Sequence, residues 1–130
     1  MFGEPTGTSL PQNSADVVFE DFESESYDGW TAEGDAFGDG PQTKETTPSY
    51  QGDVGANGTR WVNSHNMRKR ENMRSGDQHT GTLTSSEFLI ERPFIKFLVG
   101  GGNHKDKTCV NLIVNGNIVR SQTGFNQNKM

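Results

Sequence analysis

The chain has one cysteine, few apolar residues and no long hydrophobic run, and each shortage excludes a class of protein. Cys109, the single cysteine among 130 residues, rules out an intramolecular disulfide, and within "KTCVNLIV" we interpret it as a small buried apolar residue. Hydrophobic residues make up 29% of the chain, which is too few for a helical bundle. No apolar run reaches the ~18–20 residues that span a bilayer, so no membrane partner is predicted.

The N-terminal segment also lacks the features of a secretion signal. Residues 1–15 have neither a basic patch followed by an apolar core nor a cleavage-like site, and their composition predicts a disordered linker. A chain of this length supports a single core, so we expect one domain over residues 16–130.

The net charge of −5 hides an uneven distribution of charged residues. Residues 1–66 hold 12 acidic and 2 basic side chains, whereas residues 67–130 hold 5 acidic and 10 basic ones. The two halves should attract each other in a folded chain, and the acidic total argues against a nucleic-acid partner. The basic cluster of Arg68, Lys69 and Arg70 has no interleaved aromatic residues, so we predict a solvated loop and not a phosphate-binding site.

The chain does contain many short β-type segments separated by turn residues. Expected strands cover residues 16–22, 30–38, 59–64, 81–90 and 93–100. In the last of these, Ile95 and Phe97 alternate with Phe94 and Leu98, so one face should lie against a core. No window shows the 3.6-residue period of a helix. The prediction is an all-β fold, specifically an antiparallel β-sandwich of jelly-roll type.

The strongest local pattern is a hairpin at "CVNLIVNGNIVRS". Two β-branched runs flank Asn115 and Gly116, a pair suited to the positive φ angles of a type I′ turn, so Val114 should pair with Asn117. The three glycines at 100–102 lead toward this hairpin and not into a helix N-terminus. A phosphate-binding glycine loop is therefore not predicted.

Few residues form a pattern that predicts catalysis or metal binding. His65, His79 and His104 lie in separate loops without metal-ligand spacing, so exposed loop positions are favoured over a zinc site. A glycosidase needs two carboxylates ~5–10 Å apart, a pairing that this sequence does not reveal. No catalytic residue, metal ligand or cofactor is predicted. The acidic segments "FEDFESES" and "EGDAFGDG" are nevertheless compatible with a structural calcium ion.

A set of aromatic and polar side chains is suited to sugar recognition, since apolar faces and hydrogen-bonding groups together hold a sugar ring. Core packing is the alternative role for the aromatic residues, and pairing with carboxylates is the alternative for the arginines. The predicted carbohydrate-binding residues are Trp30, Glu33, Asn63, Asp77, Arg92 and Arg120.

Four segments in succession resemble one bacterial module. They are "FEDFESESYDGWTAEGDAFG", "RWVNS", "GDQHTGTLTSSEFLIERPFIKFLVGGGNH" and "KTCVNLIVNGNIVRSQTG", and together they cover about residues 17–124. The chain resembles the β-sandwich found beside glycoside hydrolase family 32 domains in levanases, whose founding members are the fructan-binding family 66 carbohydrate-binding modules. Similar segments occur in multidomain proteins of planctomycetes.

The resemblance implies a module that binds the terminal fructose of a levan-type fructan without cleaving it. It implies a polysaccharide or oligosaccharide partner, a tethered catalytic domain, and a secreted or cell-surface parent protein. The family module continues through further strands after this hairpin, so we expect an incomplete sandwich with an uncovered apolar surface. Two alternatives stay open: a fragment of a family 32 hydrolase, and a structural or interaction module without a sugar ligand.

Overall fold

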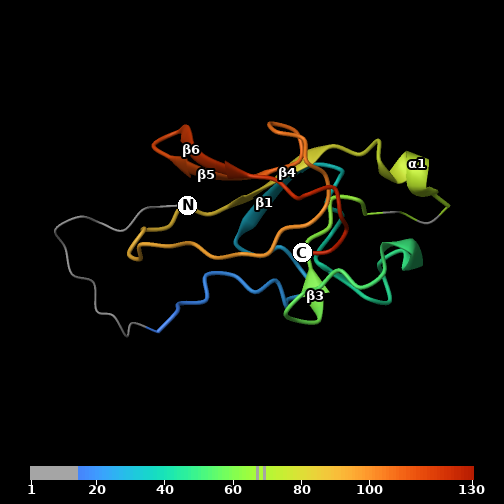
Figure 1. Cartoon of the computed structure of the whole chain (residues 1–130), viewed down its shortest axis with the longest axis horizontal. Helices are drawn as coiled ribbons and strands as arrows, with labels where there is room; N and C mark the ends of the chain where they lie inside the picture. The colour runs from blue at the N-terminus through green and yellow to red at the C-terminus, as the bar shows by residue number, and fades with distance from the viewer. Residues whose placement is uncertain (1–14, 67, 69) are drawn as a thin grey trace. The chain divides into compact units, whose positions relative to one another are not determined.

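A computed structural model describes residues 15–66, 68 and 70–130 (Figure 1). Apart from residue 15, the predicted linker lies outside the described residues. The chain divides into two compact units. The first, which we call the polar unit, contains residues 18–52 and 56–88; the second, the hairpin unit, contains residues 53–55 and 89–130 and the segment that ends at Val17. The prediction of one domain over residues 16–130 stays a prediction.

Two antiparallel strand pairs organise the polar unit. Strand β1 (Trp30–Gly34) pairs with β4 (Gly81–Ser85) in a register that runs from Trp30 opposite Ser85 to Gly34 opposite Gly81. Strand β2 (Gln42–Thr43) pairs with β3 (Arg60–Trp61). Long loops connect these strands and contain most of the polar side-chain contacts of the unit.

Helix is confined to two single turns in this unit. One is the 3-10 turn η1 (Ser49–Gln51), and the other is α1 (Met73–Gly76). Asn72 caps α1, because its side chain accepts a hydrogen bond from the Ser75 backbone and the Ser75 hydroxyl accepts one from the Asn72 backbone. This capping box explains a helical turn that sequence periodicity did not predict.

The hairpin unit contains the predicted hairpin. Strand β5 (Val110–Val114) pairs with β6 (Asn117–Gln122), and Val114 lies opposite Asn117. Asn115 and Gly116 have φ angles of 50° and 79°, as a type I′ turn requires. A register shift follows Leu112, because Leu112 faces Arg120 while Ile113 faces Ile118, which leaves an extra residue in β6. The hairpin prediction is confirmed.

The all-β class is confirmed, and two of the expected strands are wrong. The described residues form three separate two-stranded sheets, so the two-layer jelly-roll arrangement stays a prediction. Residues 16–22 form no strand, because the Glu20 carboxylate accepts the Phe22 backbone N–H at 2.8 Å and Phe22 has a φ of 57°. Such local bonds compete with strand pairing. Residues 93–100 have no partner strand among the described residues, and β-type residues alone do not form a ladder.

Few large apolar side chains are buried. Tyr27, Ala36 and Val54 make up the buried hydrophobic set of the described chain. Ile95 and Phe97 are 43% and 48% exposed, and Phe94 and Leu98 are similar, so the predicted core face over 93–100 is also wrong. This exposure agrees with the expected uncovered apolar surface. That further strands would cover this surface stays a prediction. Within the described ranges, no helix has the length and apolarity to cross a membrane.

Candidate functional site

An open cleft of about 620 Å³ lies in the polar unit. Its lining residues include three acidic residues, two with side-chain amides, a threonine and an arginine, and no aromatic residue is among those described. This volume falls in the usual range for small-molecule sites. The lining residues are Glu25, Gly34, Asp35, Gly38, Asp39, Gly40, Pro41, Gln42, Thr46, Asn66 and Arg68.

The loop that follows β1 forms one wall of this cleft and is anchored through its backbone. The Phe37 carbonyl accepts hydrogen bonds from the Tyr27 hydroxyl at 3.1 Å and from the Asn66 side-chain amide at 3.1 Å. Burial raises the pKa of Tyr27 to about 12, so the phenol stays protonated and able to donate. Tyr27 and Asn66 therefore fix the loop without using the side chains of Asp35 or Asp39.

Gly40 brings the same loop against a second segment. A Cβ atom at Gly40 would lie 2.0 Å from the Glu25 carbonyl oxygen, closer than any side chain tolerates. The backbones of residues 25 and 40 can approach only because this position is glycine. The approach brings Glu25 and Asp39 into the lining of one cleft.

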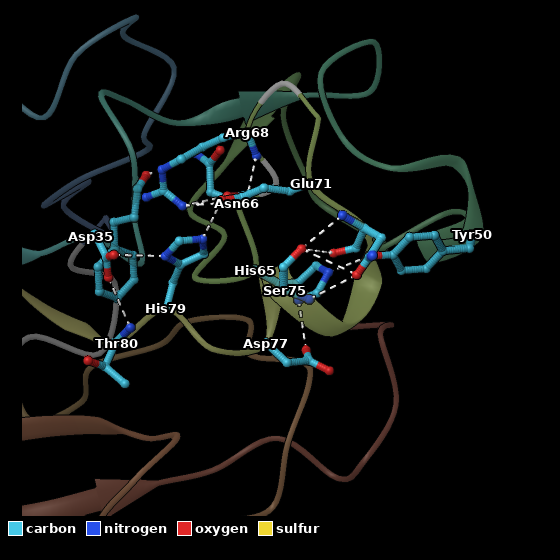
Figure 2. A network of polar contacts seen from close by, with 12 residues as sticks. Asp35, Tyr50, His65, Asn66, Arg68, Glu71, Ser75, Asp77, His79 and Thr80 are labelled. Carbon is cyan, nitrogen blue, oxygen red and sulfur yellow. Dashed lines mark hydrogen bonds and ion pairs between the residues drawn. The ribbon is translucent and has the colours of Figure 1, made fainter.

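His79 lies between two carboxylates beside the cleft (Figure 2). Its Nδ1 is 2.8 Å from Asp35 Oδ2, and its Nε2 is 2.9 Å from Glu71 Oε1. Both neighbours are carboxylate oxygens, so this arrangement favours the imidazolium form, in which both ring nitrogens donate. The hydrogen bonds to Asp35 and then to Glu71 raise the pKa of His79.

The register of β1 against β4 explains why His79 meets Asp35. Beyond the last strand pair, the Thr80 carbonyl accepts from the backbone N–H of Asp35 at 2.9 Å, and the Thr80 N–H donates to Asp35 Oδ1 at 3.2 Å. The residue before Thr80 is therefore held beside the Asp35 carboxylate. Hydrogen bonding, first from His79, lowers the pKa of Asp35.

Glu71 connects His79 to Arg68, which also lines the cleft. Glu71 Oε2 accepts from the Arg68 backbone N–H at 3.0 Å and lies 3.9 Å from Arg68 Nη1. The same Nη1 donates to the Asn66 carbonyl at 3.2 Å. The Arg68 backbone hydrogen bond is the main cause that lowers the pKa of Glu71. The solvated-loop prediction is therefore wrong for Arg68, which is half-buried and paired; Lys69 lies outside the described residues.

A second polar cluster surrounds His65 (Figure 2). His65 Nδ1 is 2.9 Å from Asp77 Oδ1, its Nε2 contacts the Tyr50 hydroxyl, and its backbone N–H donates to Asn63 Oδ1 at 3.0 Å. Burial, and then the Asp77 charge, raises the pKa of Tyr50, so its phenol is not activated as a nucleophile. The structure thus brings together two of the predicted sugar-binding residues, Asn63 and Asp77, around a histidine.

The other predicted sugar-binding residues are placed separately, and their role stays a prediction. Trp30 packs on Phe22 with ring centroids 5.1 Å apart, and its indole N–H donates to Glu20 at 2.9 Å. Glu33 is exposed on β1, where its carboxylate accepts from Thr82. Arg92 and Arg120 belong to the hairpin unit; both are exposed, and Arg120 donates to the Val119 carbonyl at 2.7 Å.

Two of the three histidines were assigned wrongly from the sequence. The side chains of His65 and His79 are 18% and 16% exposed, and each lies against a carboxylate. His79 meets Asp35 from the acidic first half, whereas His65 meets Asp77 of the second half. His104 is an exposed loop residue, as predicted. Where residues are described, no group of three or more His, Cys, Asp or Glu side chains is arranged to hold a metal ion.

The cleft itself was not predicted. Its wall, residues 34–42, falls partly in an expected strand and partly in an expected loop, and the sequence suggests only calcium binding or a catalytic carboxylate pair for its acidic residues. The alternation of glycine and aspartate in "GDAFGDG" is the one local signal, since glycines that permit close backbone approach next to carboxylates are typical of a polar binding loop.

Comparison with known proteins relates the chain to part of a longer protein. No protein-family model matches it, and no solved structure matches it. The curated protein named "Putative glycosyl hydrolase ecdE", from Aspergillus rugulosus, is 34% identical over 113 residues, which is 85% of this chain. The chain spans about 15% of the length of that relative. The similarity therefore concerns one segment of a much longer polypeptide.

Proposed function

We propose that the chain is a non-catalytic carbohydrate-binding module of a larger carbohydrate-active protein, and that the cleft in the polar unit holds the sugar. The observation that carries this proposal is the composition of the cleft. Sugar hydroxyls both donate and accept hydrogen bonds, and the lining residues include acidic residues whose carboxylates accept and an arginine whose guanidinium donates.

Asp39 is the lining residue best placed to meet a ligand. Its carboxylate is exposed at the cleft and has no hydrogen bond or ion pair to another described residue. Asp35 and Arg68, by contrast, are already held by protein partners. A ligand hydroxyl could therefore bond to Asp39 without breaking a contact that supports the fold.

The named relative supports the same class of function. It is named as a glycosyl hydrolase, and this chain corresponds to a segment about 15% of its length. A short segment of a long hydrolase is commonly an accessory module that raises the local concentration of the catalytic domain on its polymer. On this proposal the parent protein is secreted or displayed at a cell surface.

The pKa of Asp35 argues against a role for this residue as the acid of a glycosidase. A glycosidase acid needs a raised pKa so that it can protonate the leaving group. The pKa of Asp35 is lowered, because its carboxylate accepts hydrogen bonds from His79 and from the Thr80 backbone. Asp35 is therefore suited to accept a hydrogen bond from a hydroxyl and is not suited to act as the general acid.

The narrower proposal is that the ligand is the end of a fructan chain. It follows from the resemblance to the levanase-associated modules. Because the cleft lacks an aromatic platform among its described lining residues, we expect weak binding, roughly micromolar to millimolar. Asp77 and Arg120 are not among the described lining residues, so with the sugar in the cleft Asp77→Ala and Arg120→Ala should leave binding unchanged. The sequence-based prediction that they contact the sugar directly requires instead that each variant weaken binding by about 1.5–3 kcal/mol, and such a loss would refute the cleft as the binding site.

The test is titration calorimetry of the chain against levan, inulin and free fructose, with a cello-oligosaccharide as a neutral comparison, beside a reducing-sugar assay. Asp39→Ala should abolish measurable heat while leaving the unfolding curve unchanged. Glu87→Ala removes an exposed carboxylate of the same unit outside the cleft lining and serves as the matched control.

Each outcome separates the competing functions. Binding of the cello-oligosaccharide alone would keep the general proposal and refute the fructan assignment. Absence of heat with every sugar would refute carbohydrate binding and favour an interaction module. Release of reducing sugar would refute the non-catalytic assignment and favour a hydrolase fragment.

A further inference from the structure

We propose that His79 is a positioning residue of the cleft: as an imidazolium it holds Asp35 directly and Arg68 through Glu71, so that carbohydrate binding weakens as the pH rises. The inference rests on the proposed function, because it assigns a regulatory role to the same cleft. His79 itself is not among the lining residues.

Geometry is the first step of the argument. The imidazole bridges two carboxylates at 2.8 and 2.9 Å, one following β1 and the other preceding α1. Asp35 lines the cleft, and Glu71 holds Arg68, which also lines it. One ring therefore connects two lining residues, Asp35 directly and Arg68 through Glu71.

Charge is the second step. The groups that act on His79 are Asp35, Glu71 and Arg68. Burial and, less strongly, the cation of Arg68 oppose protonation of the ring, but the hydrogen bonds to Asp35 and Glu71 outweigh both, and the pKa of His79 is raised. The imidazolium form thus persists to a higher pH than in a free histidine.

Loss of the proton changes the geometry in a defined way. A neutral imidazole has one N–H, so one of its two nitrogens would present a lone pair to a carboxylate oxygen. Either Asp35 or Glu71 must then move away from the ring. In the first case Asp35 is displaced, and in the second Arg68 loses its contacts with Glu71 and keeps the one with the Asn66 carbonyl.

The sign of the pH dependence follows from the shifts of the three groups. The pKa of His79 is raised, so its support of the cleft is complete at low pH, where the ring is protonated. That support is lost as the pH rises through the raised pKa. The pKa values of Asp35 and Glu71 are lowered, so their contributions are lost only as the pH falls through those lowered values. Binding should therefore be strongest in mildly acidic solution.

The first experiment needs no sugar. The imidazole of His79 and the side chains of Asp35 and Arg68 are followed by NMR in the full chain from about pH 5.5 to about pH 8.5. We expect the Asp35 and Arg68 signals to change with the same midpoint as His79. Titration of His79 without a response at either residue would refute its positioning role.

The second experiment measures levan-oligosaccharide affinity over the same pH range. We expect the wild type to weaken about two- to fivefold from the acidic to the basic end, since the contacts are only partly shielded from water. His79→Gln, which can donate to one carboxylate only, should be weak and independent of pH. His79→Arg, a permanent cation with several donors, should bind with a flat profile near the acidic wild-type value.

His104→Gln is the control, since it removes an exposed histidine of the hairpin unit. It should keep the wild-type profile. A pH-dependent His79→Gln variant, or a flat wild type that binds sugar, would overturn the inference. Failure of every variant to bind any sugar would refute the proposed function instead, while the NMR titration would still decide whether His79 positions Asp35 and Arg68.

Discussion

The two units of this chain are ordered by different interactions. In the polar unit, side chains bond to the backbone of distant segments: Tyr27 and Asn66 both donate to the Phe37 carbonyl. In the hairpin unit, order comes from the backbone ladder between β5 and β6, while apolar side chains such as Ile113 and Phe125 are 54% and 72% exposed. One unit uses side chains to fix long loops, and the other uses a turn to fix two strands.

This difference determines what each unit can do. Long loops held by polar contacts leave room for a cleft, because the chain need not close over an apolar core. A hairpin with exposed apolar faces offers no enclosed site, but its register is set by two turn residues. Substitutions that remove one kind of support should therefore affect one unit and spare the other.

The largest effect is expected at the close backbone approach in the polar unit. Gly40→Ala should lower the free energy of unfolding by about 2–3 kcal/mol, because the added methyl group would overlap the Glu25 carbonyl and push back the cleft wall. Denaturant unfolding gives the value, and hydrogen exchange shows which unit opens. Gly29→Ala is the control. No atom lies near an added methyl group there, so only the φ of 83° opposes alanine, and the free energy of unfolding should fall by about 1 kcal/mol. Equal costs for the two variants would contradict the close approach.

Tyr27→Phe should cost about 1–1.5 kcal/mol, since it removes one buried hydrogen bond to the Phe37 carbonyl and leaves the one from Asn66. An ultraviolet titration provides an independent measurement. The wild type should show a phenol with a pKa of about 12, and the variant should lack it. A Tyr27 phenol that ionised at its ordinary pKa would show that the ring is not buried.

Gly116→Ala tests the hairpin unit in the same way. It should cost about 1 kcal/mol, because alanine resists the φ of 79° at the second turn position. Amide exchange across β5 and β6 should rise while exchange in β1 and β4 stays unchanged. Asn115→Gly, which keeps the turn geometry available, is the control. Faster exchange in both units would show that they unfold together and would remove the contrast between them.

The smallest effect is expected at a surface ion pair of the hairpin unit. Lys96 lies 3.2 Å from Asp16, with side chains 74% and 81% exposed, so Lys96→Ala should change stability by about 0.5 kcal/mol or less. Lys105→Ala, at an exposed loop position, provides the baseline. A cost well above this baseline would show that side-chain pairing also supports the hairpin unit.

Sequence reasoning succeeded where the determining interactions were local. The hairpin follows from two turn residues between β-branched runs, and the all-β class follows from the absence of helical periodicity. It failed over residues 16–22, where the Glu20 side chain bonds to the backbone of Phe22. It failed again over residues 93–100, because alternation indicates a strand only when a partner strand exists.

The candidate site was predictable only in part, for the same physical reason. Asn63 and Asp77 were selected as polar residues, and the structure places both on His65. The pairing of His79 with Asp35 depends on the register of two strands separated by more than forty residues, and no local pattern encodes it. Residues that act together across such distances become visible only when the chain is folded.

The anchoring of the cleft wall through the Phe37 carbonyl has a consequence for how this protein could change its ligand. Two donors outside the loop hold its backbone, and Asp39 has no hydrogen bond or ion pair to another described residue. Neutral, amide or basic side chains at position 39 should therefore change the free energy of unfolding little. Each would present a different group to the cleft. Selectivity for a ligand and survival of the fold are thereby separable at this site, which makes residue 39 a natural starting point for directed evolution of new binding preferences.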